Sequence, residues 1–215
     1  MSASSPGTRF APGVVILGAG ASSRMGQPKL LLPWAETTIV GHVIAQWRKL
    51  HAGQISVVCG ADDRRLQQEL DRVGNPRKDR IVNPAPERGM MSSIRCAAGW
   101  TGWDARLTHW AIALGDQPHL QIATLRAATG FAALHPGCIC QPSRNGRPRH
   151  PVFLPAASFR ELVSAAEENL KEFLHARAES RRMIELDDTG LDLDLDEPAD
   201  YERAFKMAFP GLAAR

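Results

Sequence analysis

Short apolar runs alternate with amphipathic stretches along the first part of the chain. The runs at residues 14–17, 55–59 and 110–114 are each followed directly by a glycine, and a shorter run covers residues 80–83. A short continuous apolar run that ends at a turn residue is typical of a strand buried on both faces. We therefore expect four strands here.

The stretches between these strands have the spacing of amphipathic helices. After the threonine pair at residues 37–38, apolar residues recur at helical spacing as far as Trp47. An aspartate at residues 62–63 can cap a second helix and Ser92 a third, before a fourth over residues 122–134. This alternation predicts an α/β fold, a three-layer Rossmann-like arrangement with a mainly parallel sheet.

The rhythm changes after residue 137. Three short apolar runs (CICQP, PVFLP and RMIEL) flank a helix that we expect over residues 156–177. No Pro/Gly linker divides the chain, so these elements are expected to join the same sheet. We predict a disordered lead-in at residues 1–12 and one domain over residues 13–209.

Composition excludes several classes of protein. Of the 215 residues, 44% are hydrophobic and 23% charged, as in an ordinary globular protein. No apolar run approaches the roughly 20 residues of a membrane helix, and the N-terminus has no apolar signal region. A net charge of +3 is too small for a nucleic-acid footprint. We expect a cytoplasmic protein with free thiols at its four cysteines.

Charge is nevertheless uneven along the chain. Residues 187–200 (DDTGLDLDLDEPAD) are strongly acidic, whereas residues 144–150 (RNGRPRH) are basic. An acidic cluster beside basic loops suits a site that handles phosphates and a metal. Two unrelated solvated surfaces would give the same pattern.

The loop after the first strand carries the first chemical signal, LGAGASSRMGQPK at residues 17–29. Glycines after a buried strand let the backbone turn tightly, and successive N–H groups there can bind an anion. Arg24 and Lys29 add positive charge. The loop lacks the dinucleotide fingerprint because Ser23 replaces its last glycine, and it lacks the Gly-Lys-Ser/Thr of a P-loop. A glycine-rich turn with two exposed cations is the alternative.

The order of residues in this loop resembles the signature of the MobA-like nucleotidyltransferases, L-A-[AG]-G-x-[SA]-x-R-M-G-x-x-K. The resemblance implies their nucleotidyltransferase fold, a nucleotide-binding half over residues 13–118 and an acceptor-binding half over residues 119–209. It also implies that the loop backbone binds the nucleotide, while Arg24 and Lys29 hold its triphosphate and serve catalysis. The backbone residues are Leu17, Gly18, Ala19 and Gly20. Gly18 stands where the family usually has alanine, and we expect it to be sterically harmless.

Two acidic corners resemble the metal site of the same family. Asp116 follows an apolar run, so it should lie at the C-terminal end of a strand, where ligands gather in open α/β sheets. In the family an aspartate here binds metal and phosphates and serves catalysis. The segment LDLDEPADY resembles a second family motif, which makes Asp196 the other metal ligand and lets Asp194 assist. Two carboxylates suffice for Mg²⁺, which takes its remaining oxygen ligands from water and phosphates. A helix cap at Asp116 and a solvated acidic face are the alternatives.

Two further segments resemble the family in part. The sequence NPAPERGMMSSI places Gly89, Ser92 and Ser93 near the nucleotide, although Ser92 can equally serve as a helix cap. The sequence RNGRPRHPVF resembles a segment on the acceptor side, which implies acceptor binding by His150 and Pro151. Arg149 replaces a family glycine and can either clash with the usual acceptor or hold an anionic one.

The resemblance is strongest to the molybdenum cofactor cytidylyltransferases of this family. It implies Mg²⁺-dependent transfer of CMP from CTP to molybdopterin, with release of pyrophosphate. Two alternatives remain. One is a guanylyltransferase that uses GTP, or a relative with another phosphorylated acceptor. The other is a non-catalytic nucleotide-binding or cofactor-delivery module. A molybdoenzyme or its chaperone is an expected partner, and nucleic acid and membranes are not.

Overall fold

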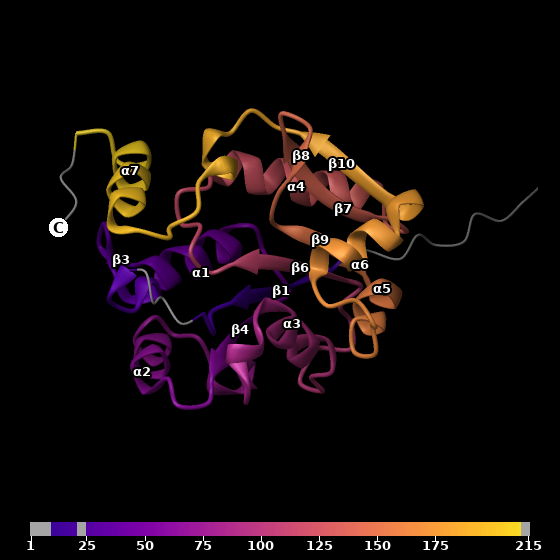
Figure 1. The fold of residues 1–215 in the computed structure, drawn as a ribbon, viewed down its shortest axis with the longest axis horizontal. Helices are drawn as coiled ribbons and strands as arrows, with labels where there is room; N and C mark the ends of the chain where they lie inside the picture. The colour runs from indigo at the N-terminus through magenta and orange to yellow at the C-terminus, as the bar shows by residue number, and fades with distance from the viewer. Residues whose placement is uncertain (1–9, 21–24, 212–215) are drawn as a thin grey trace, which may run out of the picture.

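The computed structural model describes residues 10–20 and 25–211, and its centre is one sheet covered by helices on both faces (Figure 1). The strand order is β10-β7-β9-β6-β1-β4-β5, with β8 paired to β7. A separate two-stranded sheet joins β2 (Pro33–Trp34) and β3 (Thr37–Thr38). This arrangement confirms the predicted α/β class with a mainly parallel sheet.

The parallel half of the sheet comes from the four predicted strands. They are β1 (Pro12–Leu17), β4 (Gln54–Gly60), β5 (Arg80–Asn83) and β6 (His109–Leu114). Val14 of β1 lies opposite Ile55 of β4 on one side and Ala111 of β6 on the other. Because all four strands run the same way, their C-terminal ends meet at one edge of the sheet.

The helices of this half largely follow the expected bounds. They are α1 (Ile39–Lys49), α2 (Arg64–Arg72), α3 (Met90–Ala98) and α4 (Ile122–Leu134). Thr38 caps α1 by accepting from the Gly41 amide, and Asp63 caps α2 by accepting from the Leu66 amide. The prediction that Ser92 caps a helix is wrong, because α3 already begins at Met90.

The second half adds strands of both directions. The strands β7 (Ile139–Arg144), β8 (Arg147–Pro148) and β9 (Val152–Pro155) pair antiparallel, and β10 (Arg181–Glu185) runs parallel to β7. The helix expected over residues 156–177 is instead two short helices, α5 (Ala156–Glu161) and α6 (Leu170–Ala176). Asn169 accepts from the Glu172 amide and so starts α6 afresh.

Side chains alternate across the sheet into two hydrophobic cores. Val14 and Phe153 enter the core on the side of α1, α4 and α7 (Pro198–Ala208), whereas Val15 and Val152 enter the core beneath α3, α5 and α6. Trp34 is fully buried and ties β2 to α7 through ring contacts with Tyr201, Phe205 and Phe209. Two cores around one sheet give the three layers.

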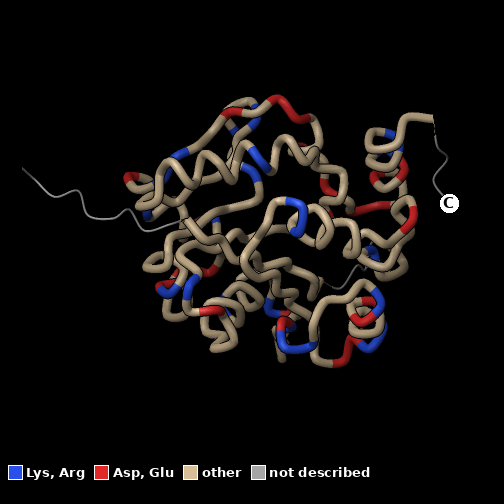
Figure 2. The backbone as a smooth tube through the Cα atoms, turned by 180° about the vertical axis from the view of Figure 1, so that it is seen from behind, with Lys and Arg blue, Asp and Glu red and all other residues tan. Residues whose placement is uncertain are grey.

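Charge follows the sequence pattern in space. Figure 2 shows the acidic stretch along the segment that leads into the C-terminal helix.

Strand β1 begins at Pro12, and the Ala11 amide already donates to the Thr108 hydroxyl at 3.0 Å. No helix within residues 10–20 and 25–211 is long and apolar enough to cross a membrane.

Candidate active site

A cavity of about 490 Å³ opens where the C-terminal ends of β1 and β6 meet. Segments that are far apart in the sequence form its wall. The lining residues are Leu17, Gly18, Ala19, Gly20, Lys29, Leu30, Pro86, Glu87, Gly89, Met90, Ser93, Leu114, Asp116, Asp194 and Asp196. Most residues predicted from the sequence to bind nucleotide or metal therefore surround one space.

Two glycines bring the strand ends close together at this cavity. A Cβ atom on Gly18 would lie 2.9 Å from the Val58 carbonyl oxygen, and one on Gly115 would lie 2.7 Å from the Leu17 carbonyl oxygen. Both distances are shorter than side chains tolerate, so an alanine at residue 18 would push β1 away from β4. The sequence predicts only that glycine is sterically harmless at residue 18. The structure shows in addition that close packing against Val58 favours glycine there.

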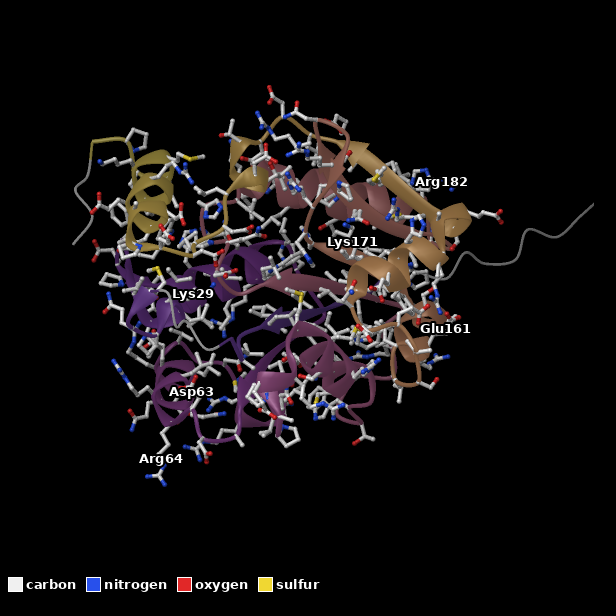
Figure 3. The ribbon with its side chains drawn as sticks, in the orientation of Figure 1. Lys29, Asp63, Arg64, Glu161, Lys171 and Arg182 are labelled. Atoms are coloured by element: carbon white, nitrogen blue, oxygen red, sulfur yellow. The ribbon has the colours of Figure 1, made fainter. Side chains whose placement is uncertain are left out.

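Lys29 joins the two acidic corners. It begins the short 3-10 helix η2 (Lys29–Leu31), and its ammonium forms a salt bridge with Asp116 and lies 3.8 Å from Asp196 Oδ1. It also donates to the Leu195 carbonyl at 3.3 Å. The side chains of Lys29 and Asp116 are 16% and 18% exposed, so this pair is largely shielded from water. In Figure 3, Lys29 lies between the N-terminal elements and the segment leading into α7.

Alternation along residues 193–196 aims the acidic side chains at the cavity. Leu193 and Leu195 are buried in the core, so Asp194 and Asp196 point the other way and line the cavity. The Gln117 amide donates to Asp194 Oδ1 at 3.4 Å, which links this segment to the loop after β6. The burial of Leu193 and Leu195 thus brings Asp194 and Asp196 to the same cavity as Asp116.

Buried hydrogen bonds hold the acidic segment in place. His119 donates from Nε2 to the carbonyls of Gly190 and Leu193 at 3.1 and 3.0 Å. Burial lowers the pKa of His119, although these carbonyls and nearby carboxylates act in the opposite direction. Asp188 is buried and accepts bonds from the Thr124 hydroxyl and the Gly190 amide. The segment is thus fixed by groups that do not face the cavity.

The start of α7 is fixed in the same manner. Asp200 accepts from the Glu197 amide at 3.0 Å, and the two side chains form a reciprocal capping box. Asp200 thereby supports the first turn of α7, and Glu197 supplies the other half of the cap.

The carboxylates of the cavity suit a hard divalent cation. Asp116, Asp194 and Asp196 offer oxygen atoms, and the ammonium of Lys29 shows that positive charge is favoured between them. Within the described part of the chain, no group of three or more His, Cys, Asp or Glu is placed to hold a metal by itself. Mg²⁺ does not need such a group, because it keeps waters and substrate phosphates as ligands.

Gly89 and the serine pair take different places. Gly89 has a φ of 84° and lines the cavity, as does the buried Ser93. The Ser92 hydroxyl is held by the Asn83 amide at 2.8 Å and donates to the Gly89 carbonyl at 2.7 Å, so it shapes the loop instead of lining the cavity. Asn83 bonds both serines and is a positioning residue that sequence reasoning missed. The signal in the sequence was the position of Asn83 at the end of a predicted strand.

The predicted acceptor residues lie outside this cavity. His150 bonds through Nδ1 to the Ile112 carbonyl at 3.2 Å, and burial lowers its pKa. Pro151 is buried. Arg149, the departure from the family pattern, forms a salt bridge with Asp192 at 2.5 Å. Arg24 lies outside the residues that the structure describes.

The chain is similar to a known protein family and to a curated protein. The MobA-like NTP transferase domain family matches residues 14–183. The molybdenum cofactor cytidylyltransferase of Escherichia coli K12 is 27% identical over 189 residues, which cover 87% of this chain and 92% of that protein.

Solved structures show the same fold. Rv0371c from Mycobacterium tuberculosis H37Rv superimposes with a TM-score of 0.76 at 26% identity, covering 93% of this chain and 99% of that one. A complex of Rv0371C with manganese has a TM-score of 0.73 at 24% identity, covering 92% and 99% of the two chains.

Proposed function

Because the chain belongs to the MobA-like NTP transferase family and is a nucleotidyltransferase, we propose that it transfers CMP from CTP to molybdopterin with Mg²⁺ as its metal. The observation that carries this proposal is the shared cavity. The glycine loop after β1, Lys29 and the carboxylates of Asp116 and Asp196 line one space, as binding of a nucleoside triphosphate and a divalent cation requires. The cytidylyltransferase relative supports CTP and the molybdopterin acceptor.

The glycine loop and Lys29 would hold the triphosphate. The backbone N–H groups of Ala19 and Gly20 are the donors that can approach phosphate oxygens closely, because side chains there are small or absent, whereas the Gly18 amide already donates to the Val58 carbonyl at 2.9 Å. In the substrate-free protein the Lys29 ammonium pairs with Asp116. When the triphosphate enters, Lys29 would exchange this carboxylate for phosphate oxygens and neutralise negative charge that grows on the leaving group.

Asp116 and Asp196 would hold Mg²⁺, with Asp194 beside them. When bound there, the cation supplies charge neutralisation and makes the α-phosphorus more electrophilic. Divalent metals are typical of the family, and manganese is present in a solved structure of the same fold. The residues present therefore fit the metal that the proposal requires.

The transfer itself needs no protein nucleophile. A phosphate oxygen of the acceptor attacks the α-phosphorus of CTP, and the bond from that phosphorus to the bridging oxygen of the β-phosphate breaks. Pyrophosphate leaves with the electron pair, and a new diphosphate bond joins CMP to the acceptor. The chain contributes by positioning the two substrates and by neutralising charge.

The test is pyrophosphate release from a panel of nucleoside triphosphates with Mg²⁺ and molybdopterin. We expect CTP to be the best substrate and Asp116→Asn to reduce release by about a thousandfold or more with an unchanged circular-dichroism spectrum. Asp104→Asn makes the same chemical change far from the cavity, beside Arg106, and should behave like the unmodified protein.

The outcomes separate the alternatives. Faster turnover of GTP than of CTP would make the protein a guanylyltransferase. Nucleotide binding without pyrophosphate release for any acceptor would make it a binding or delivery module. Full activity of Asp116→Asn would refute the metal assignment.

A further inference from the structure

A second cavity, of about 390 Å³, lies between α6 and the hairpin of β7 and β8. Its buried lining residues Val152, Leu170 and Leu174 belong to the core beneath α3, α5 and α6. Figure 3 places Lys171 on this side, on α6. The lining residues are Gln141, Arg147, Pro148, Arg149, His150, Val152, Leu170, Lys171, Leu174 and Arg181.

The two cavities have opposite charge. The glycine-loop cavity is lined by four carboxylates, and Lys29 is the one basic side chain among the described residues there. In the second cavity, four of the described lining residues are cationic and none is Asp or Glu. The first cavity therefore favours a metal cation, and the second favours an anion.

Three of the four cations are available to a ligand. Arg149 is held by Asp192. Among the described residues, no carboxylate lies within salt-bridge distance of Arg147, Lys171 or Arg181. Three cations that converge on one hollow without a counter-charge repel one another, and a bound anion relieves this repulsion.

The floor of the second cavity adds a hydrogen-bonding group. Gln141 is 3% exposed, and its Nε2 donates to the Arg149 carbonyl at 3.1 Å. Its Oε1 has no donor among the described residues. A buried carbonyl oxygen without a donor is unfavourable, so a ligand that brings an N–H group would be stabilised there. Val152, Leu170 and Leu174 are buried and give the cavity apolar walls, against which a flat ring can pack.

His150 connects the second cavity to β6. It lines this cavity and bonds to the carbonyl of Ile112 on β6. Leu114, two residues further along β6, lines the glycine-loop cavity. Two residues of a strand span about 7 Å, so His150 at the second cavity and Leu114 at the glycine-loop cavity meet β6 within about 7 Å of each other along the strand.

We propose that the second cavity binds the end of the acceptor remote from its phosphate, as a planar heterocycle that carries ring N–H groups and negative charge. Gln141 accepts from the ring, and Arg147, Lys171 and Arg181 hold the charge. The proposal rests on the proposed function, in which this heterocycle is the pterin. The phosphate of the same molecule then extends past His150 towards the nucleotide.

Binding of pterin-6-carboxylate, a fluorescent pterin with one anionic group, tests the assignment without any turnover. We expect the unmodified protein to bind it and Arg181→Gln to weaken binding roughly tenfold or more, because a charge-assisted contact is lost. Arg182→Gln is the matched control. Arg182, labelled in Figure 3, follows Arg181 on β10 but does not line the cavity. Successive strand residues point to opposite faces of a sheet.

Two further variants keep the test decisive. Lys171→Gln should weaken pterin-6-carboxylate binding while leaving CTP binding unchanged, since Lys171 lies outside the glycine-loop cavity. Gln141→Leu should weaken binding of the pterin more than binding of inorganic phosphate, which has no ring. No pterin-6-carboxylate binding by the unmodified protein, or equal loss in Arg181→Gln and Arg182→Gln, would overturn the inference.

The experiment also separates this inference from the proposed function. If pterin binding depends on Arg181 but CTP yields no pyrophosphate, the cavity assignment stands and the proposed reaction fails. If pyrophosphate release is intact and the acceptor KM is unchanged in Arg181→Gln and Lys171→Gln, the reaction stands and the cavity assignment fails.

Discussion

Replacing Lys29 with methionine should make the stability of the protein depend on a divalent cation. The change keeps the length and much of the packing of the side chain and removes its charge. At 3.8 Å from Asp196, and with an effective dielectric constant of about 20, the ammonium and carboxylate attract by about 4 kcal/mol, which is an upper bound on what this one pair contributes. Because Asp196 is 37% exposed, solvent screening lowers this figure. We expect the free energy of unfolding in EDTA to fall by about 2 kcal/mol, which lowers Tm by about 4–8 °C.

The metal response is the second part of this prediction. Without Lys29, the carboxylates of Asp116 and Asp196 lose an internal cation, and an added cation can take its place. MgCl₂ at about 100 times its Kd for the variant would then restore about 2.7 kcal/mol. The same concentration should add less to the unmodified protein, because Lys29 competes with the cation there. Thermal unfolding in EDTA and across a MgCl₂ titration measures both effects, with Lys78→Met at an exposed site as control. Equal Tm values in EDTA, or equal Mg²⁺ shifts in both proteins, would refute the reasoning.

Three other perturbations have defined outcomes. Asp192→Asn removes the carboxylate that pairs with Arg149 and leaves the second cavity with a fourth cation for an anionic ligand, so the acceptor KM should fall in steady-state assays while the CTP KM stays constant. Because burial lowers the pKa of His119, the unfolded chain binds more protons as the pH falls from 7 to 5, and the free energy of unfolding should fall. In His119→Gln, urea titrations at the two pH values should show a smaller drop, and an equal drop would contradict this assignment. Trp34→Ala removes a fully buried ring that packs against Tyr201, and urea unfolding should show a loss of about 3–5 kcal/mol.

The sequence predicted strands and helix caps correctly where they depend on neighbouring residues in the chain. Continuous apolar runs mark β1, β4, β5 and β6 because both faces of these strands are buried. Thr38 and Asp63 cap helices because their side chains accept from amides three residues on, within reach of the sequence itself. Ser92 has the same chemistry but is not a cap, because α3 already begins at Met90. Its hydroxyl instead accepts from Asn83, at the end of β5.

The break between α5 and α6 was harder to predict, because it too depends on contacts between separate elements. Residues 156–177 carry enough helix-forming residues for one helix, but Asn169 starts a new one and Arg177 is fixed by Glu161 and Glu167. Such contacts depend on how α5 and α6 pack against the sheet. Helical propensity alone does not contain that information.

The sequence by itself determined the class of fold and the family, and it predicted which residues bind phosphate and metal, because these inferences rest on strand-ending glycines and a position-specific motif. Only the tertiary structure decided which of them meet. Lys29 and Leu195 are 166 positions apart and share a hydrogen bond because the segment after β1 and the segment before α7 meet at the edge where the parallel strands end. The same packing brought Arg147 and Arg181 to one cavity whose charged lining residues are all cationic, which no spacing along the chain predicts.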